Sequence, residues 1–191
     1  LNGLFLLFWI NLAVEEEWKS LTVSSWMIVF SVASFLIFKI TKKKEPFYVY
    51  TGIGIAMLAA ATSFELKGAT LTIAYIIETG IILFISYLIT RNIEIIKMLS
   101  LISIGPILLS FESIASPLWR TSIFLKDFFV LFFLSLVLFG LGIFFLYQTK
   151  KIEDKSNQKI DKIFLIVGSI YFYILLWLSF YAGFNNKNIA V

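Results

Sequence analysis

The chain has 191 residues, of which 60% are hydrophobic, and it carries a net charge of +4 with no histidine and no cysteine. The lack of both residue types excludes disulfides, thiolate nucleophiles, Cys/His zinc sites and imidazole acid–base chemistry, and we predict no cofactor and no metal site. An ordinary soluble domain is about half apolar, so this composition indicates an integral membrane protein.

Seven apolar stretches, separated by short charged connectors, predict membrane-spanning helices. Residues 128–147 and 163–184 contain no charged side chain, and each reaches the roughly 20 residues that a helix needs to cross a bilayer. We therefore predict an all-α fold: a polytopic helical membrane protein with about seven transmembrane helices, forming a single domain over residues 1–191. The expected spans are Leu4–Val14, Leu21–Phe38, Phe47–Phe64, Ala69–Thr90, Met98–Phe111, Phe128–Tyr147 and Ile163–Phe184.

Two of these spans are irregular. The first is short and no basic residue precedes it, so we expect a truncated helix at the start of a fragment of a longer membrane protein, with a short interfacial segment as the alternative. The fifth covers 14 residues and contains Gly105-Pro106. Because proline removes a backbone donor and clashes with the preceding turn, this span begins earlier, near Ile95, or is kinked.

The basic residues are unevenly divided between the two sides of the membrane. If the connectors alternate sides, 11 lysines and arginines fall on one side and 5 on the other. Because basic residues mark the cytoplasmic side, we predict cytoplasmic Lys42–Lys44 and Lys150–Lys162 connectors in a bacterial inner membrane. Topology thus accounts for the lysines and no nucleic-acid partner is predicted. The expected partners are the lipid bilayer and other membrane helices of the same or another chain.

Small residues recur at helical spacing in the second and third spans. Such residues let helix backbones approach closely, and their hydroxyls can bond across the contact. We therefore interpret both stripes as helix-packing faces. They comprise Ser24, Ser31 and Ser34 in the second span, and Gly52, Ala56, Ala60 and Ser63 in the third.

Glu78 is the main candidate for a functional site inside the membrane. It lies near the middle of the fourth span, where a charge costs at least ~2.5 kcal/mol, so intramembrane carboxylates are rare and by default functional. Tyr75 is one turn away, and Thr79 is part of a hydroxyl stripe with Thr72 and Ser86. Since no lysine or arginine occurs at matching depth in another span, we expect Glu78 to be neutral.

We further expect Glu78 to face the protein interior and to bond a hydroxyl or a backbone carbonyl. Two interpretations remain open. In the functional one, Glu78 is a proton or cation relay or contacts a polar headgroup. In the structural one, Glu78 is a protonated residue that joins packed helices. Candidate partners besides Tyr75 and Thr79 are Ser31, Ser34, Thr62 and Ser63.

A second candidate site is a mouth with both signs of charge on the external side. Connector alternation places six residues there, although nothing in the sequence shows that they converge, and interfacial anchoring is the simpler interpretation. They are Glu65, Lys67, Glu112, Arg120, Lys126 and Asp127.

The stretch Ala60–Leu101 resembles a family of large bacterial polytopic membrane proteins of unknown function. Its pattern is an acidic residue and a glycine at a short turn, then Ala-aromatic-x-x-Glu early in the next helix and an arginine at the following helix end. Here these positions are Glu65 and Gly68, then Ala74-Tyr75-Ile76-Ile77-Glu78, then Arg91. Tyr75 stands where the family usually has tryptophan. The resemblance implies that Glu78 belongs to a recurring motif in a longer protein, and it implies no activity.

Three functions remain open. The first is a non-catalytic membrane component or scaffold of the bacterial cell envelope. The second is a transporter or channel segment that uses Glu78, which a water-filled cavity reaching Glu78, or a broken helix beside it, would favour. The third is an enzyme for lipid-linked substrates, in which Arg120 and Lys126 hold phosphate beside a carboxylate. Convergence of these basic residues with Glu65 or Glu112 around one cleft would favour it.

Overall fold

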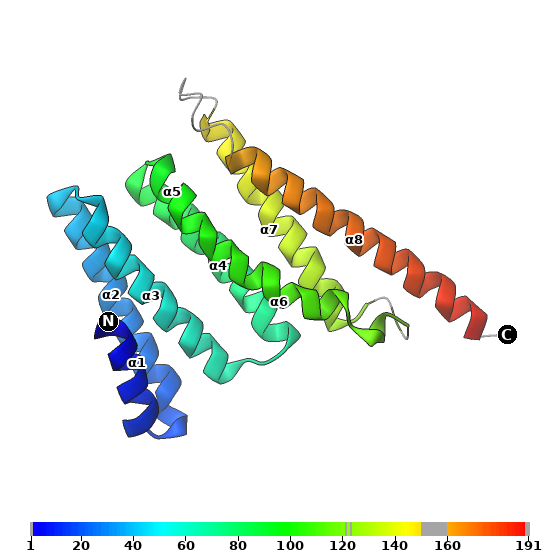
Figure 1. Cartoon of the computed structure of the whole chain (residues 1–191), viewed down its shortest axis with the longest axis horizontal. Coiled ribbons are helices and arrows are strands. Elements are labelled where there is room, and N and C mark those ends of the chain that lie inside the picture. The colour runs from blue at the N-terminus through cyan, green and yellow to red at the C-terminus, as the bar shows by residue number, and fades with distance from the viewer. Residues whose placement is uncertain (1, 121, 123, 150–159, 190–191) are drawn as a thin grey trace. The chain divides into compact units, whose positions relative to one another are not determined.

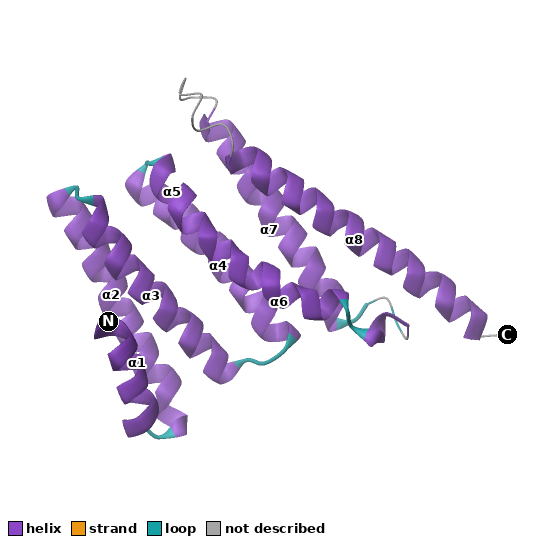
Figure 2. Cartoon of the chain, in the orientation of Figure 1, coloured by secondary structure: helices purple, strands orange, loops and turns teal. Residues whose placement is uncertain are grey.

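The apolar stretches fold as helices, and the polar connectors end them. The computed structural model describes residues 2–120, 122, 124–149 and 160–189; within these ranges it contains helices and no strand (Figure 2), so the all-α prediction is confirmed. The α-helices are α1 (Asn2–Ala13), α2 (Glu16–Thr41), α3 (Lys44–Glu65), α4 (Ala69–Thr90), α5 (Ile93–Leu99), α6 (Ile104–Ile114), α7 (Lys126–Thr149) and α8 (Ile160–Ile189). Two 3₁₀ turns are η1 (Ser100–Ser103) and η2 (Pro117–Arg120).

Six helical segments of the described residues are long and apolar enough to cross a membrane. Together with the shorter α1 they coincide with the seven stretches expected from the sequence, which confirms a polytopic helical architecture. The six segments are Glu16–Thr41, Glu45–Glu65, Ala69–Thr90, Ile93–Ile114, Lys126–Gln148 and Ile160–Phe184.

The fifth span begins earlier than the predicted Met98 and is irregular. It starts at Ile93, passes through the η1 turn and continues as α6, so it is one helix with a 3₁₀ stretch inside it. The backbone keeps right-handed helical angles at Leu99, Ser100, Ser103 and Ile104. Pro106 follows this stretch and lacks the N–H that an α-helix would bond to the carbonyl oxygen four residues earlier.

Contacts divide the chain into two compact units, Leu1–Lys67 and Gly68–Val191. The expectation of a single domain over residues 1–191 stays a prediction. Residues 150–159 of the Lys150–Lys162 connector lie outside the described residues.

The first unit is a long hairpin of α2 and α3 with α1 packed onto it (Figure 1, blue to cyan). Its core is formed by Ile10, Val23, Met57 and Ala61. The serine stripe of α2 contributes to the hairpin contact: the Ser34 hydroxyl donates to the Phe47 carbonyl oxygen at 3.3 Å and also bonds the Thr51 hydroxyl.

The packing face of α3 lies beside the small-residue stripe predicted from the sequence. Gly54 is buried, and a Cβ atom there would lie 3.1 Å from the Ser31 hydroxyl oxygen. Gly52 and Ala56 of the predicted stripe are exposed and line a shallow apolar pocket of about 310 Å³ with residues of α1. Spacing alone identified small residues but not the face that packs.

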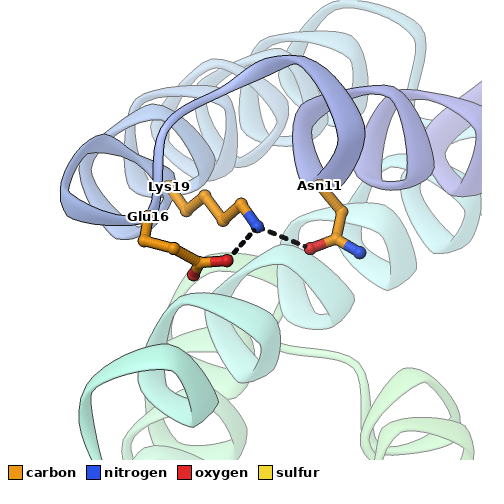
Figure 3. Close-up of polar contacts among 3 residues, drawn as sticks. All are labelled: Asn11, Glu16 and Lys19. Atoms are coloured by element: carbon orange, nitrogen blue, oxygen red, sulfur yellow. Dashed lines mark hydrogen bonds and ion pairs between the residues drawn. The ribbon is translucent and has the colours of Figure 1, made fainter.

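One charged cluster fixes the turn between α1 and α2 (Figure 3). The Lys19 ammonium donates to the Asn11 side-chain oxygen at 3.1 Å and to the Glu16 carboxylate at 2.7 Å. Lys19 is only 6% exposed, so these two bonds satisfy a charge that would otherwise be costly to bury. Glu16 also lies in the first turn of α2, where the helix dipole favours an acid.

The second unit is built around the pair α7 and α8, against which α4, α6 and η2 pack (Figure 1). Glycines allow the close approach of α7 and α8. A Cβ atom on Gly142 would lie 2.7 Å from Leu165 Cγ, and one on Gly168 would lie 3.3 Å from Leu138 Cβ. This is the small-residue contact through which membrane helices pack.

Candidate functional site

Glu78 lies on a continuous α4 at the border of its buried face. Thr72, Thr79 and Ser86 are each 5–7% exposed, so the hydroxyl stripe is interior, whereas Glu78 and Tyr75 are half-buried. Both Glu78 and Tyr75 have interaction partners. Whether Glu78 bonds one of the hydroxyls expected from the sequence stays a prediction, because Ser31, Ser34, Thr62 and Ser63 all belong to the first unit.

A tight turn folds the fifth span back along α4. Arg91 ends α4 in the left-handed conformation, with φ 49°, and its N–H bonds the Tyr87 carbonyl oxygen. The Asn92 side chain then caps α5 by accepting the Glu94 N–H at 2.9 Å. Since α4 contacts α5, η1 and α6, equal numbers of residues counted in both directions from this turn place Glu78 roughly level with Gly105, next to η1.

The polar residues at the other end of α4 form a pocket of about 390 Å³. It lies where the C-terminus of α6, the η2 turn and the N-termini of α4 and α7 meet. Two carboxylic acids contribute to it, Glu112 from the last turn of α6 and Asp127 from the first turn of α7. The lining residues are Ala69, Thr72, Glu112, Ser113, Ala115, Ser116, Pro117, Leu118 and Asp127.

This pocket contains part of the predicted external mouth. Glu112 and Asp127 line it, whereas Arg120 and Lys126 are exposed and are not among its lining residues. Glu65 and Lys67 belong to the first unit, so their place in a mouth stays a prediction. The structure therefore groups two of the acids with hydroxyls rather than with the basic residues.

A buried tryptophan holds the wall of the pocket in place. Trp119 is 2% exposed, and its indole N–H donates to the Ser113 carbonyl oxygen at 2.8 Å, which ties η2 to the end of α6. The Ser116 hydroxyl oxygen accepts the Leu118 N–H at 3.4 Å within the same turn. On the opposite wall the Thr72 hydroxyl donates to the Gly68 carbonyl oxygen at 3.3 Å. Hydrogen bonds between residues close in the sequence therefore hold both walls of the pocket.

Deeper in the second unit, polar side chains join helices to one another. The Ser110 and Tyr171 hydroxyls bond each other at 2.9 Å and link α6 to α8, and Tyr171 also donates to the Ile107 carbonyl oxygen at 3.3 Å. The Tyr87 hydroxyl donates to the Gln148 side-chain oxygen at 3.2 Å and links α4 to α7. These contacts stabilise the bundle that carries the pocket.

Comparison with protein-family models, curated proteins and solved structures finds no match for this chain. The resemblance of Ala60–Leu101 to a family of large bacterial membrane proteins therefore stays a prediction.

The sequence did not single out Ser113, Ser116 or the pocket that they line. Ser113 follows Glu112 directly, but a hydroxyl near a helix end is too common to indicate a site. A stronger signal is Trp119 beside Arg120, a pair typical of the membrane–water interface, and in the structure the Trp119 side chain is buried.

Proposed function

We propose that this chain is a non-catalytic component of a bacterial inner membrane whose second unit binds a polar ligand or partner group at one membrane face. The observation that carries the proposal is the pocket in which Glu112 and Asp127 meet the hydroxyl residues Thr72, Ser113 and Ser116. Ligand sites are concave, of about 300–1,000 Å³, and have a few polar groups that fix orientation. The volume of this pocket lies at the lower end of that range.

The arrangement favours binding over the phosphate chemistry considered above. An enzyme for lipid-linked phosphates would need Arg120 and Lys126 beside a carboxylate in one cleft. In the structure these two side chains are exposed outside the lining, while the lining itself carries two carboxylates. Like charges repel, so the pocket is suited to a cationic or neutral polar group rather than to phosphate.

The membrane orientation is part of this proposal. Its support is the excess of basic residues in one set of connectors, 11 against 5. Because the chain has no cysteine, single substitutions can be labelled without background. Lys43→Cys is expected to react with an impermeant maleimide only from the cytoplasmic side, and Lys67→Cys only from the external side. Labelling of both positions from the same side would contradict the topology.

Transport through Glu78 is a second candidate, which the 3₁₀ stretch in the fifth span favours. A 3₁₀ stretch within a longer helix often marks a functional hinge. Here η1 lies in the span that packs against α4, near the level of Glu78. The buried Thr72 connects the acidic pocket to the same helix face as Thr79.

Reconstitution separates these two functions. We expect proteoliposomes with the purified chain to show no proton, sodium or potassium flux above that of empty vesicles. We expect the variant Ala115→Trp, which fills the pocket, to lose ligand binding while its elution volume in size-exclusion chromatography stays the same. Glu78→Gln keeps a donor and an acceptor and should fold normally. A cation flux that Glu78→Gln abolishes would overturn the non-catalytic binding role and establish the transporter instead.

A further inference from the structure

We propose that the pocket between Glu112 and Asp127 binds a primary ammonium group, either in the headgroup of an aminophospholipid or in a small soluble amine. The inference rests on the proposed function, since it names the ligand class of the same pocket. Its volume of about 390 Å³ can hold a headgroup-sized molecule together with a few waters, each of which takes about 30 Å³.

The first argument is charge. Glu112 and Asp127 form no ion pair within the described residues, where Lys19 pairs with Glu16. Glu112, Arg120 and Lys126 are all exposed, so solvent and salt screen these three charges, whereas Asp127 is half-buried. What distinguishes the two acids is that they line the pocket and the two basic residues do not. The N-termini of α4 and α7 and the C-terminus of α6, at about half an elementary charge each, sum to about +0.5, so the groups that line the pocket carry a net negative charge.

The position of Glu112 strengthens this argument. Asp127 lies in the first turn of α7, where the helix dipole stabilises an acid without any ligand. Glu112 lies in the last turn of α6, where its charge adds to the negative end of the dipole. A carboxylate placed at the wrong helix end and beside a second carboxylate favours an external cation at the point where they meet.

The second, independent argument is an unsatisfied hydroxyl. Ser113 is 4% exposed and lines the pocket, its carbonyl oxygen accepts the Trp119 indole N–H, and its hydroxyl makes no hydrogen bond within the described residues. The fully enclosed side-chain atoms without partners are Ser103 Oγ and Asp161 Oδ1. The Ser113 hydroxyl is not one of them, and because Ser113 lines the pocket we infer that this hydroxyl faces it. It can accept one N–H of an ammonium group whose other two N–H groups meet the carboxylates.

The ligand is an ammonium group rather than a metal ion because of the donors. No group of three or more acidic, histidine or cysteine side chains that could hold a metal occurs among the described residues. Two carboxylates and one hydroxyl instead match the three donors of a primary ammonium, in charge-assisted bonds that are roughly twice as strong as neutral ones.

Binding to the full chain in nanodiscs tests the proposal. The probes are phosphatidylethanolamine in phosphatidylcholine discs, and soluble ethanolamine added to discs of phosphatidylcholine alone. Native mass spectrometry measures retained lipid, and protection of Glu112 and Asp127 from carbodiimide labelling measures occupancy. We expect Glu112→Gln and Asp127→Asn each to weaken binding of one probe about tenfold or more. The matched control Glu17→Gln alters an exposed acid of the first unit and should change nothing.

The outcomes separate the ligand class from the function. Protection by the lipid alone identifies a headgroup, and protection by ethanolamine alone identifies a soluble amine. Equal binding by wild type, Glu112→Gln and Asp127→Asn would overturn the ammonium proposal.

If phosphatidylglycerol protects the two acids and Ala115→Trp abolishes that protection, the pocket binds a ligand but not an ammonium group. If none of the probes protects Glu112 and Asp127 from labelling, and Ala115→Trp changes the binding of none of the probes, both proposals fail. Both amide variants nearly preserve side-chain shape, and their helical circular dichroism and elution volume serve as folding controls.

Discussion

The two units use polar side chains in different ways. In the first unit they act near a turn or across one hairpin: Lys19 joins Asn11 and Glu16, and Ser34 joins Phe47 and Thr51. In the second unit hydroxyls occur throughout the interior, on α4, α6 and α7, and one helix end opens into an acidic pocket. The first unit thus confines its buried polar groups to a turn and a hairpin contact, whereas the second distributes them along several helices.

The main helix pairs of the two units, α2 with α3 and α7 with α8, also differ in how closely they approach. In the second unit a Cβ atom on Gly142 would meet Leu165 at Cγ and, at 3.1 Å, at the backbone nitrogen. In the first unit a Cβ atom on Gly54 would meet at 3.1 Å only the hydroxyl oxygen of Ser31, a side-chain atom that can rotate. A rigid contact resists added volume more than a movable one. This contrast sets the order of the effects expected below.

The largest effect is expected at the α7–α8 contact. Gly142→Ala should destabilise the second unit by about 1–3 kcal/mol, because the new methyl group forces the two helices apart. Gly140→Ala is the matched control on the same helix, since a Cβ atom there meets nothing within 4 Å. It should be neutral or stabilising by up to about 1 kcal/mol, because alanine favours helix more than glycine. Thermal unfolding in detergent, followed by near-UV circular dichroism, measures both. Equal melting temperatures for the two variants would contradict the close approach.

An intermediate effect is expected at the hydrogen bonds that link α6 to α8. Tyr171→Phe removes the hydroxyl that bonds Ser110 and the Ile107 carbonyl oxygen. Hydrogen bonds between membrane helices contribute about 0.6 kcal/mol on average and at most about 1.7, so we expect a loss in that range. Tyr173→Phe changes a neighbouring tyrosine that is 70% exposed and should have no effect. The same melting assay decides between them, and a Tyr171→Phe variant as stable as Tyr173→Phe would show that the interior hydroxyls contribute nothing.

The sequence predicted helix positions better than helix contacts. The range Ala69–Thr90 of α4 agrees residue for residue, because Gly68 and Arg91, both with positive φ, end the helix on its two sides. In contrast α2 begins at Glu16 instead of Leu21, since charged residues can continue a helix beyond its apolar part. Hydropathy reports which residues avoid water, and it sets the ends of a span only where a turn residue stops the helix.

The candidate site was predictable only in its separate parts. Glu112 and Asp127 stand out as charges at span ends, yet their place in one pocket depends on tertiary packing, including the bond between Trp119 and Ser113. The irregularity of the fifth span was indicated by Gly105-Pro106, but the η1 stretch itself precedes that dipeptide. Local composition indicates such features, and tertiary packing decides where they lie.

The smallest effect is expected in the first unit, where two glycines of α3 provide a matched pair. Gly52→Ala adds a methyl group that meets nothing within 4 Å, so it should stabilise α3 by about 0.5–1 kcal/mol through helix propensity. Gly54→Ala gains the same propensity but pushes the Ser31 hydroxyl, whose weak contact with Met27 Sδ at 3.8 Å leaves it free to rotate. The gain in helix propensity and the cost of moving the Ser31 hydroxyl nearly cancel. The net change in the free energy of unfolding should therefore stay within about 0.5 kcal/mol of zero. If Gly54→Ala instead destabilises the chain as much as Gly142→Ala does, α2 and α3 pack as rigidly as α7 and α8, and the contrast between the two units is wrong.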